Sequence, residues 1–132
     1  MGSMADDPRI TRTVETELTP DELWSLVGDG EGWATWLVDD ADIVVEPGAT
    51  GTVVDDDEVR DVRIDRVEPH ERVAFTWWPQ GRTEQATVVE LVVVPGRLLI
   101  SETKNAAPVA SAAIRWDVRA LVLSSLSLAA RV

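Results

Sequence analysis

The sequence predicts an α+β fold: an antiparallel sheet of about six to seven strands packed against a long C-terminal helix, with two short helices after the first strand. Three observations predict it. Apolar residues recur with the period of two that is typical of strands over residues 43–103. Turn signals such as Pro47-Gly48 and Pro95-Gly96 separate these runs, which favours hairpins. Residues 108–132 open with proline and are rich in alanine and leucine, which favours a helix.

The first elements are predicted from alternation and from capping signals. Residues 10–18 alternate between apolar and polar side chains, as a half-buried strand does. The Thr19-Pro20-Asp21-Glu22 segment has the residues of a capping box and predicts the start of a helix. We expect Gly28 to end this helix in a left-handed conformation. The apolar spacing in Trp33-Ala34-Thr35-Trp36-Leu37 predicts a second helix of about two turns.

Six further strands are expected, at residues 43–46, 50–54, 58–68, 72–78, 83–94 and 97–103. The Asp55-Asp56-Asp57 triplet should form the tip of a hairpin. It lacks the alternating ligands, the central glycine and the final glutamate of an EF-hand loop, so we expect a solvated turn and no metal site.

The C-terminal helix is predicted to carry two apolar lines. The first line consists of Ile114, Val118, Leu121 and Leu128, and the second of Val109, Trp116 and Leu123. We expect the first line to face the sheet. The second could face the short helices, a cavity or a second subunit, so a homodimer is left open.

Composition excludes several classes of function. The chain has 132 residues and a net charge of −12, which disfavours nucleic acids and anionic membranes as partners. It has no cysteine, so disulfides and thiolate chemistry are excluded. No segment is apolar enough to span a membrane, and no signal peptide is present. We therefore expect a soluble, cytoplasmic single domain over residues 4–132, after an expression scar at residues 1–3.

The order and spacing of several segments resemble the SRPBCC (START-like, helix-grip) superfamily. Within it, the chain looks most like bacterial relatives of the C-terminal domain of the heat-shock-protein-90 ATPase activator. The segments that carry the resemblance include Thr19-Pro20-Asp21-Glu22-Leu23-Trp24, Trp33-Ala34-Thr35-Trp36-Leu37, Glu46-Pro47-Gly48, Arg72-Val73-Ala74-Phe75-Thr76-Trp77, Glu90-Leu91-Val92 and Gly96-Arg97-Leu98. The chain departs from many of those relatives at Glu102, where they end the last strand with a histidine.

The resemblance implies a curved sheet that grips the C-terminal helix, with a cavity between them. Members bind lipids, sterols, plant hormones or polyketides, and some act as cyclases, aromatases or chaperone partners. The superfamily has no universal catalytic motif, so the resemblance implies no catalytic residue, and we expect no cofactor or metal.

The candidate cavity lining consists of large apolar side chains and one carboxylate: Trp36, Val62, Phe75, Trp77, Val89, Leu91, Ile100, Glu102 and Trp116. These residues could instead fill the core completely. Trp33 or Trp78 could be more exposed, as part of a contact surface.

Two titratable residues stand out. By alternation, Glu102 shares the inward face of its strand, where a carboxylate must be paired or have a raised pKa. It could pair with Arg115 or Arg119, lie exposed at the sheet end, or orient a ligand. His70, the only histidine, is expected in a solvent-facing turn, without an enclosed substrate on which it could act as a base.

The function predicted from these observations is the binding of a small hydrophobic ligand between the sheet and the C-terminal helix. A cyclase, aromatase or hydrolase working in the same cavity is a second hypothesis, so enzymatic activity is left undecided. A chaperone-associated protein-interaction domain is the third, and it depends on fold-level kinship alone.

Overall fold

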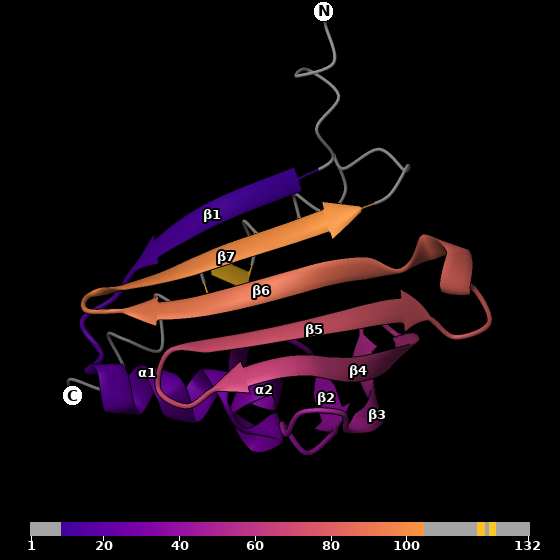
Figure 1. Ribbon diagram of the computed structural model, residues 1–132, viewed down its shortest axis with the longest axis horizontal. Coiled ribbons are helices and arrows are strands. Elements are labelled where there is room, and N and C mark those ends of the chain that lie inside the picture. Colours follow the sequence, from indigo (N-terminus) through magenta and orange to yellow (C-terminus); the bar gives the residue numbers. More distant parts are fainter. Residues whose placement is uncertain (1–8, 105–118, 121, 124–132) are drawn as a thin grey trace, which may run out of the picture.

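The structure is a computed structural model that describes residues 9–104, 119–120 and 122–123, and one antiparallel sheet dominates it (Figure 1). The elements in chain order are β1 (Arg9–Glu15), α1 (Pro20–Val27), α2 (Gly30–Trp36), β2 (Asp40–Asp42), β3 (Thr50–Asp55), β4 (Glu58–Glu68), β5 (Arg72–Pro79), the 3-10 turn η2 (Thr83–Gln85), β6 (Thr87–Val94) and β7 (Arg97–Lys104). Residues 119, 120, 122 and 123 are helical. The strand order is β1-β7-β6-β5-β4-β3-β2.

This architecture confirms the α+β class, the antiparallel sheet and the two short helices after the first strand. Consecutive strands from β2 to β7 pair as hairpins, as their short turns predict. Only β1 pairs with a strand that is distant in the sequence. It lies antiparallel beside β7, so the first and last described strands are neighbours in the sheet. Most of the segment predicted to form the long C-terminal helix lies outside the described residues.

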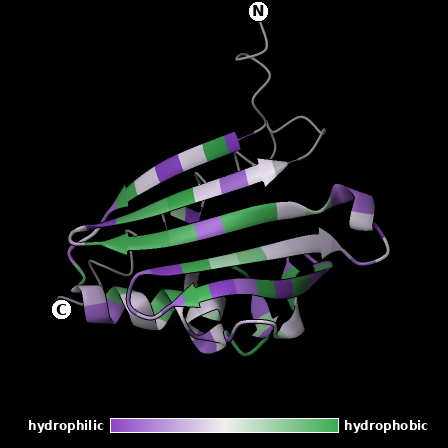
Figure 2. Cartoon of the chain, viewed as in Figure 1, coloured by the Kyte–Doolittle hydropathy of each residue, from purple (hydrophilic) through white to green (hydrophobic). Residues whose placement is uncertain are grey.

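Alternation gives the sheet two different faces. The inner face carries the buried apolar side chains Ile10, Val14, Val53, Val62, Ile64, Val73, Phe75, Trp77, Val89, Leu91, Val93, Leu98 and Ile100. The outer face carries mostly polar side chains. On β6 it also carries valines, so that strand is hydrophobic over most of its length in Figure 2. A bulge between Ile64 and Arg66 in β4 increases the local bend of the sheet.

Helices α1 and α2 are fixed to each other by two tryptophans. The Trp33 indole N–H donates to the Val27 carbonyl at 2.7 Å, and the Trp36 indole N–H donates to the Leu26 carbonyl at 2.9 Å. The Trp33 ring also lies 4.6 Å from the Phe75 ring, between centroids, which places the helix pair over the inner face of β5. Trp33 is fully buried and Trp78 is half-buried, so of the two candidates for a more exposed tryptophan only Trp78 remains.

The start of α1 confirms the predicted capping box, but its end does not follow the prediction. The Thr19 hydroxyl accepts from the Glu22 backbone N–H at 3.1 Å, and the Glu22 carboxylate accepts from the Thr19 N–H at 2.8 Å. Gly28, however, has φ −98°, so the expected left-handed cap is wrong. A Cβ at Gly28 would lie 2.5 Å from the Trp24 side chain, so glycine is needed there for space.

Two strand predictions also need correction. The expected strand at residues 43–46 is wrong, because pairing with β3 ends at Asp42, opposite Thr52. A Cβ at Gly51 would lie 2.3 Å from the Asp42 carbonyl, so the chain crosses close over β3 as it leaves the sheet. The expected strand at residues 83–94 begins only at Thr87, since Thr83–Gln85 forms a 3-10 turn. Among the described residues, no helix is long and apolar enough to cross a membrane.

The close contact between the helices predicts that Gly32→Ala destabilises the protein. A Cβ at Gly32 would lie 2.2 Å from the Ser25 carbonyl oxygen. Overpacking of this kind costs about 1–3 kcal/mol, against a gain of about 1 kcal/mol in helix propensity. Because the clash is with backbone, the upper end of this cost applies, and we expect a net loss of about 2 kcal/mol in the free energy of unfolding, measured in urea. Glu31→Ala, at an exposed position of α2, is the control and should change stability little; an equally stable Gly32→Ala protein would contradict this packing.

Candidate functional site

A buried carboxylate, Glu102 on β7, is the centre of a polar cluster on the inner face. It is 1% exposed. Its Oε2 accepts hydrogen bonds from the Thr87 hydroxyl at 2.5 Å and from the Trp77 indole N–H at 3.0 Å. The Trp77 N–H also points at the Thr87 hydroxyl oxygen, 3.0 Å away. We call these three residues the Glu102 cluster.

Strand register brings the Glu102 cluster together from three neighbouring strands. Thr87 on β6 is directly opposite Trp77 on β5, and Val89 is opposite Glu102. Thr87 and Glu102 are therefore diagonal neighbours on one face, within reach of each other. The inner-face neighbours Phe75, Val89 and Ile100 are apolar, so the cluster is a polar group among buried apolar side chains.

Arg60 is a further polar side chain next to the Glu102 cluster. By alternation it shares the inner face of β4 with Val62. Its guanidinium carbon lies 5.1 Å from the centroid of the Trp77 ring, a cation–π geometry. It also forms an ion pair with Glu58 at 2.8 Å.

A second ion pair connects the sheet to the terminal segment. Arg119 donates to Asp55, at the end of β3, and lies 3.5 Å from the Asp39 carboxylate. Arg119 therefore does not pair with Glu102, and that alternative is wrong; Arg115 lies outside the described residues. Exposure of Glu102 at the sheet end is also wrong, because this side chain is buried, with 1% of its surface exposed.

Asp55 differs from the solvated turn that the sequence predicts for it. Asp56 and Asp57 form the exposed hairpin tip, with φ of 52° and 65°, but Asp55 is 4% exposed on the inner face. Oxygens of Asp39, Asp55 and Asp56 lie within 4.8 Å of one another. The Arg119 guanidinium contacts two of these carboxylates and supplies the positive charge they need.

The structure buries every described residue of the predicted lining. Trp36, Val62, Phe75, Trp77, Val89, Leu91, Ile100 and Glu102 are all at most 2% exposed. Trp36 differs from the other lining residues because it packs between the helices: its indole N–H donates a hydrogen bond to the Leu26 carbonyl of α1. Trp116 lies outside the described residues. Leu123, from the second apolar line of the terminal segment, is fully buried.

Sequence reasoning missed Thr87, Arg60 and Asp55 as members of the site. A signal for Thr87 exists in the sequence, since alternation places it on the same face as Val89 and Leu91. A polar residue in that series predicts a buried hydroxyl that needs a partner. The pairing of Asp55 with Arg119 has no such signal, because the two lie far apart in the chain.

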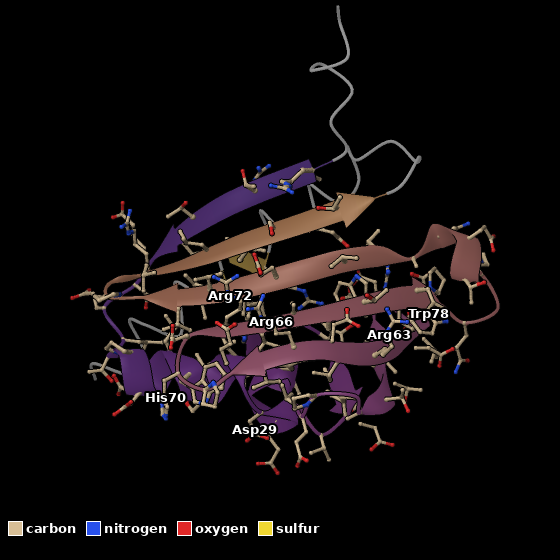
Figure 3. All side chains as sticks on the ribbon, in the orientation of Figure 1. Asp29, Arg63, Arg66, His70, Arg72 and Trp78 are labelled. Atoms are coloured by element: carbon tan, nitrogen blue, oxygen red, sulfur yellow. The ribbon has the colours of Figure 1, made fainter. Side chains whose placement is uncertain are left out.

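His70 lies away from the Glu102 cluster, in the turn between β4 and β5. Its side chain is 65% exposed, which confirms the solvent-facing turn. It has φ 65° and lies 3.5 Å from Asp21, beside the Trp24 ring of α1 (Figure 3). Figure 3 also shows Arg63, Arg66 and Arg72 spread along β4 and β5.

The arginines along the outer face are paired with carboxylates. Arg63 donates to Asp65 at 2.8 Å, and Arg72 donates to Glu90 at 2.9 Å. The outer face therefore balances its charges locally, and its ion pairs are solvent-screened.

No protein-family model matches the sequence, and no curated protein does. Solved structures do match. DynU16, from the dynemicin biosynthetic locus, has a TM-score of 0.80 and 24% identity over 90% of this chain, which spans only 46% of DynU16. MLL2253 from Mesorhizobium loti has a TM-score of 0.77 and 18% identity, covering 89% of this chain and 95% of that one.

The Aha1 dimer from Colwellia psychrerythraea matches with a TM-score of 0.66 and 15% identity, covering 90% of this chain and 95% of that one. At these identities the likeness shows the fold alone. The fold of the described sheet and helices is therefore the one that these solved structures share.

The Glu102 cluster predicts that Thr87→Val destabilises the protein without changing side-chain volume much. Removing a donor from a buried carboxylate costs about 1–3 kcal/mol. The control is Thr76→Val on the outer face, because Thr76 donates to Asp65 at 2.6 Å and the Asp65 side chain is 30% exposed. Water can replace that hydrogen bond, so the control should lose less than about 1 kcal/mol. Urea unfolding of both variants tests this; equal losses would contradict it.

Proposed function

We propose that this chain is a cytoplasmic binding module for a small hydrophobic ligand. The ligand would lie between the inner face of the sheet and the C-terminal helix, in a helix-grip arrangement. The observation that carries the proposal is the Glu102 cluster: a buried carboxylate, a hydroxyl and an indole N–H among buried apolar side chains of the inner face. Ligand sites in proteins are mostly apolar, with a few polar groups that fix the orientation of the ligand.

Stability alone gives little reason for a glutamate at this position. Burying a carboxylate costs several kcal/mol unless hydrogen bonds compensate, and they rarely return more than the cost. An apolar residue at position 102 would pack against Val89 and Ile100 without that cost. A role in recognition explains why the position carries a group that accepts hydrogen bonds.

The fold supports the same proposal. The described sheet has the arrangement of DynU16, which comes from the dynemicin biosynthetic locus. A small organic molecule is therefore the class of ligand that we infer for this chain. The finer kinship to bacterial relatives of the heat-shock-protein-90 activator is part of the proposal and is supported by the fold of the Aha1 dimer.

A cyclase- or hydrolase-type enzyme is the second candidate, and the contact between Glu102 and Thr87 favours it. A buried carboxylate beside a hydroxyl could accept a proton from a bound substrate. Histidine is not available as its acid–base partner, because the single histidine, His70, lies in the exposed β4–β5 turn. Binding is therefore the preferred function.

The test compares 2-naphthol with 2-methoxynaphthalene, two fluorescent probes of which only the first can donate a hydrogen bond. If Glu102 orients the ligand, Glu102→Gln should weaken the binding of 2-naphthol at least about tenfold, because a hydrogen bond to a charged group contributes about 1.5–3 kcal/mol and each 1.4 kcal/mol is a factor of ten. The affinity for 2-methoxynaphthalene should stay the same. Titration by fluorescence or calorimetry measures both.

Glu90→Gln is the matched control, since Glu90 lies on the outer face of β6 and pairs with Arg72. It should leave both affinities unchanged. Native protein that binds neither probe would contradict the proposed function. A Glu102→Gln protein with unchanged affinities and a large loss of thermal stability would assign Glu102 a structural role only.

A further inference from the structure

We propose that the outer edge of β1 pairs with the same strand of a second copy of this chain, so that the two sheets join into one. In the part of the chain that the structure describes, β1 lies at one end of the strand order and has a neighbour, β7, on one side only (Figure 1). An edge strand presents backbone N–H and C=O groups with which another strand can pair. This inference is independent of the proposed ligand.

The backbone groups on the outer edge of β1 belong to its odd-numbered residues. The Thr16 N–H donates to the Gly96 carbonyl at 3.0 Å, directly after the last pair of the β1–β7 ladder. Hydrogen-bonded and non-hydrogen-bonded pairs alternate in an antiparallel ladder, so the even-numbered residues bond to β7 and the odd-numbered ones point away from it. The Thr11 carbonyl accepts from the Arg12 side chain at 2.8 Å, which agrees with a carbonyl on the outer edge.

β1 is complementary to itself in one antiparallel register, in which two copies overlap over all seven residues. One pair across the two strands is then of opposite charge, one is apolar and one consists of threonines: Arg9 with Glu15, Ile10 with Val14, and Thr11 with Thr13. Pairs of these kinds stabilise antiparallel strands. Odd-numbered residues meet odd-numbered residues, so the outward N–H and C=O groups of both strands face each other. Two-fold symmetry makes every such pair occur twice.

The opposite edge of the sheet, β2, lacks this complementarity. It has three residues, and a second copy in the corresponding register would place Asp40 opposite Asp42. Like charges directly opposite each other destabilise a strand pair. Short strands, prolines and bulges are ways in which proteins prevent pairing at an edge. β1 is longer, contains no proline and pairs with β7 in an unbroken register.

Arg12 opposes the pairing and sets its strength. By alternation it lies on the inner face between Ile10 and Val14, and it would meet the Arg12 of the second copy at the two-fold axis. Its bond to the Thr11 carbonyl must also be given up. Inward-pointing charges limit edge pairing. We therefore expect a dimer that dissociates on dilution, and Arg12→Thr should tighten it.

Sedimentation equilibrium of the full chain, from micromolar to millimolar concentrations, measures this dimer. The salt concentration should be about 0.15 M, because the repulsion between two copies of net charge −12 is then screened beyond about 8 Å. A chain that stays monomeric at every concentration would overturn the proposal.

Charge exchange tests the register. Arg9→Glu or Glu15→Arg, at exposed positions, places like charges at two sites of the dimer, and each should weaken it about tenfold. An equimolar mixture of the two variants restores opposite charges at both sites, so a heterodimer of native affinity should form, identified by its mass in native mass spectrometry. The control is Arg82→Glu with Glu84→Arg, at exposed positions between β5 and β6, which should keep native affinity alone or mixed. Variants that dimerise like the native chain, or that form no heterodimer when mixed, would overturn the register.

Thr13→Pro tests the backbone pairing itself. It removes an N–H that points away from β7, so the fold should be retained, as circular dichroism can verify, while the dimer should weaken at least about tenfold. Thr13→Val is the matched control, because it keeps the N–H and the branched shape of the side chain, and its affinity should stay close to native. A dimer that Thr13→Pro leaves unchanged would assign the contact to another surface and overturn the proposal.

Discussion

The seven-stranded sheet has one apolar face that must be covered, and the rest of the structure depends on how it is covered. Two short helices cover part of that face, and their indole hydrogen bonds and close glycine contact make them one rigid unit. They are too short to cover all of it. At the other end, the inner face carries Glu102, Arg60 and Asp55, and the terminal segment reaches it through Arg119 and Leu123. The division of the inner face into an apolar part and a polar end follows from this arrangement.

Burying charged groups at the polar end is costly for the fold, and we propose that these groups serve ligand recognition. Each buried charge there has a partner in the structure: Thr87 and Trp77 for Glu102, and Arg119 for Asp55. Pairing reduces the cost of burial but rarely makes a charged group more stabilising than an apolar one. A few polar groups gathered at one end of a mostly apolar face are typical of small-molecule sites, which is the role that we propose for them.

The sheet could be predicted from the sequence because its signals are local. Period-two alternation and Pro-Gly turns define strands such as 58–68 without knowledge of their neighbours. The expected strand at residues 43–46 failed because the close passage of Asp42 over Gly51 is a tertiary contact. The partners of Glu102 could not be predicted because they depend on the register of three strands. The Arg119–Asp55 pair joins residues 64 positions apart, and no local pattern encodes it.

The central claim is that the inner face holds a small molecule, and native mass spectrometry of the purified protein tests it most directly. If the account is correct, gently ionised protein carries an additional mass of a few hundred daltons that disappears on denaturation, or acquires one after incubation with a small-molecule extract. Replacing Glu102 by glutamine should reduce the bound fraction. A spectrum that contains only the mass of the chain, before and after incubation, would contradict the account.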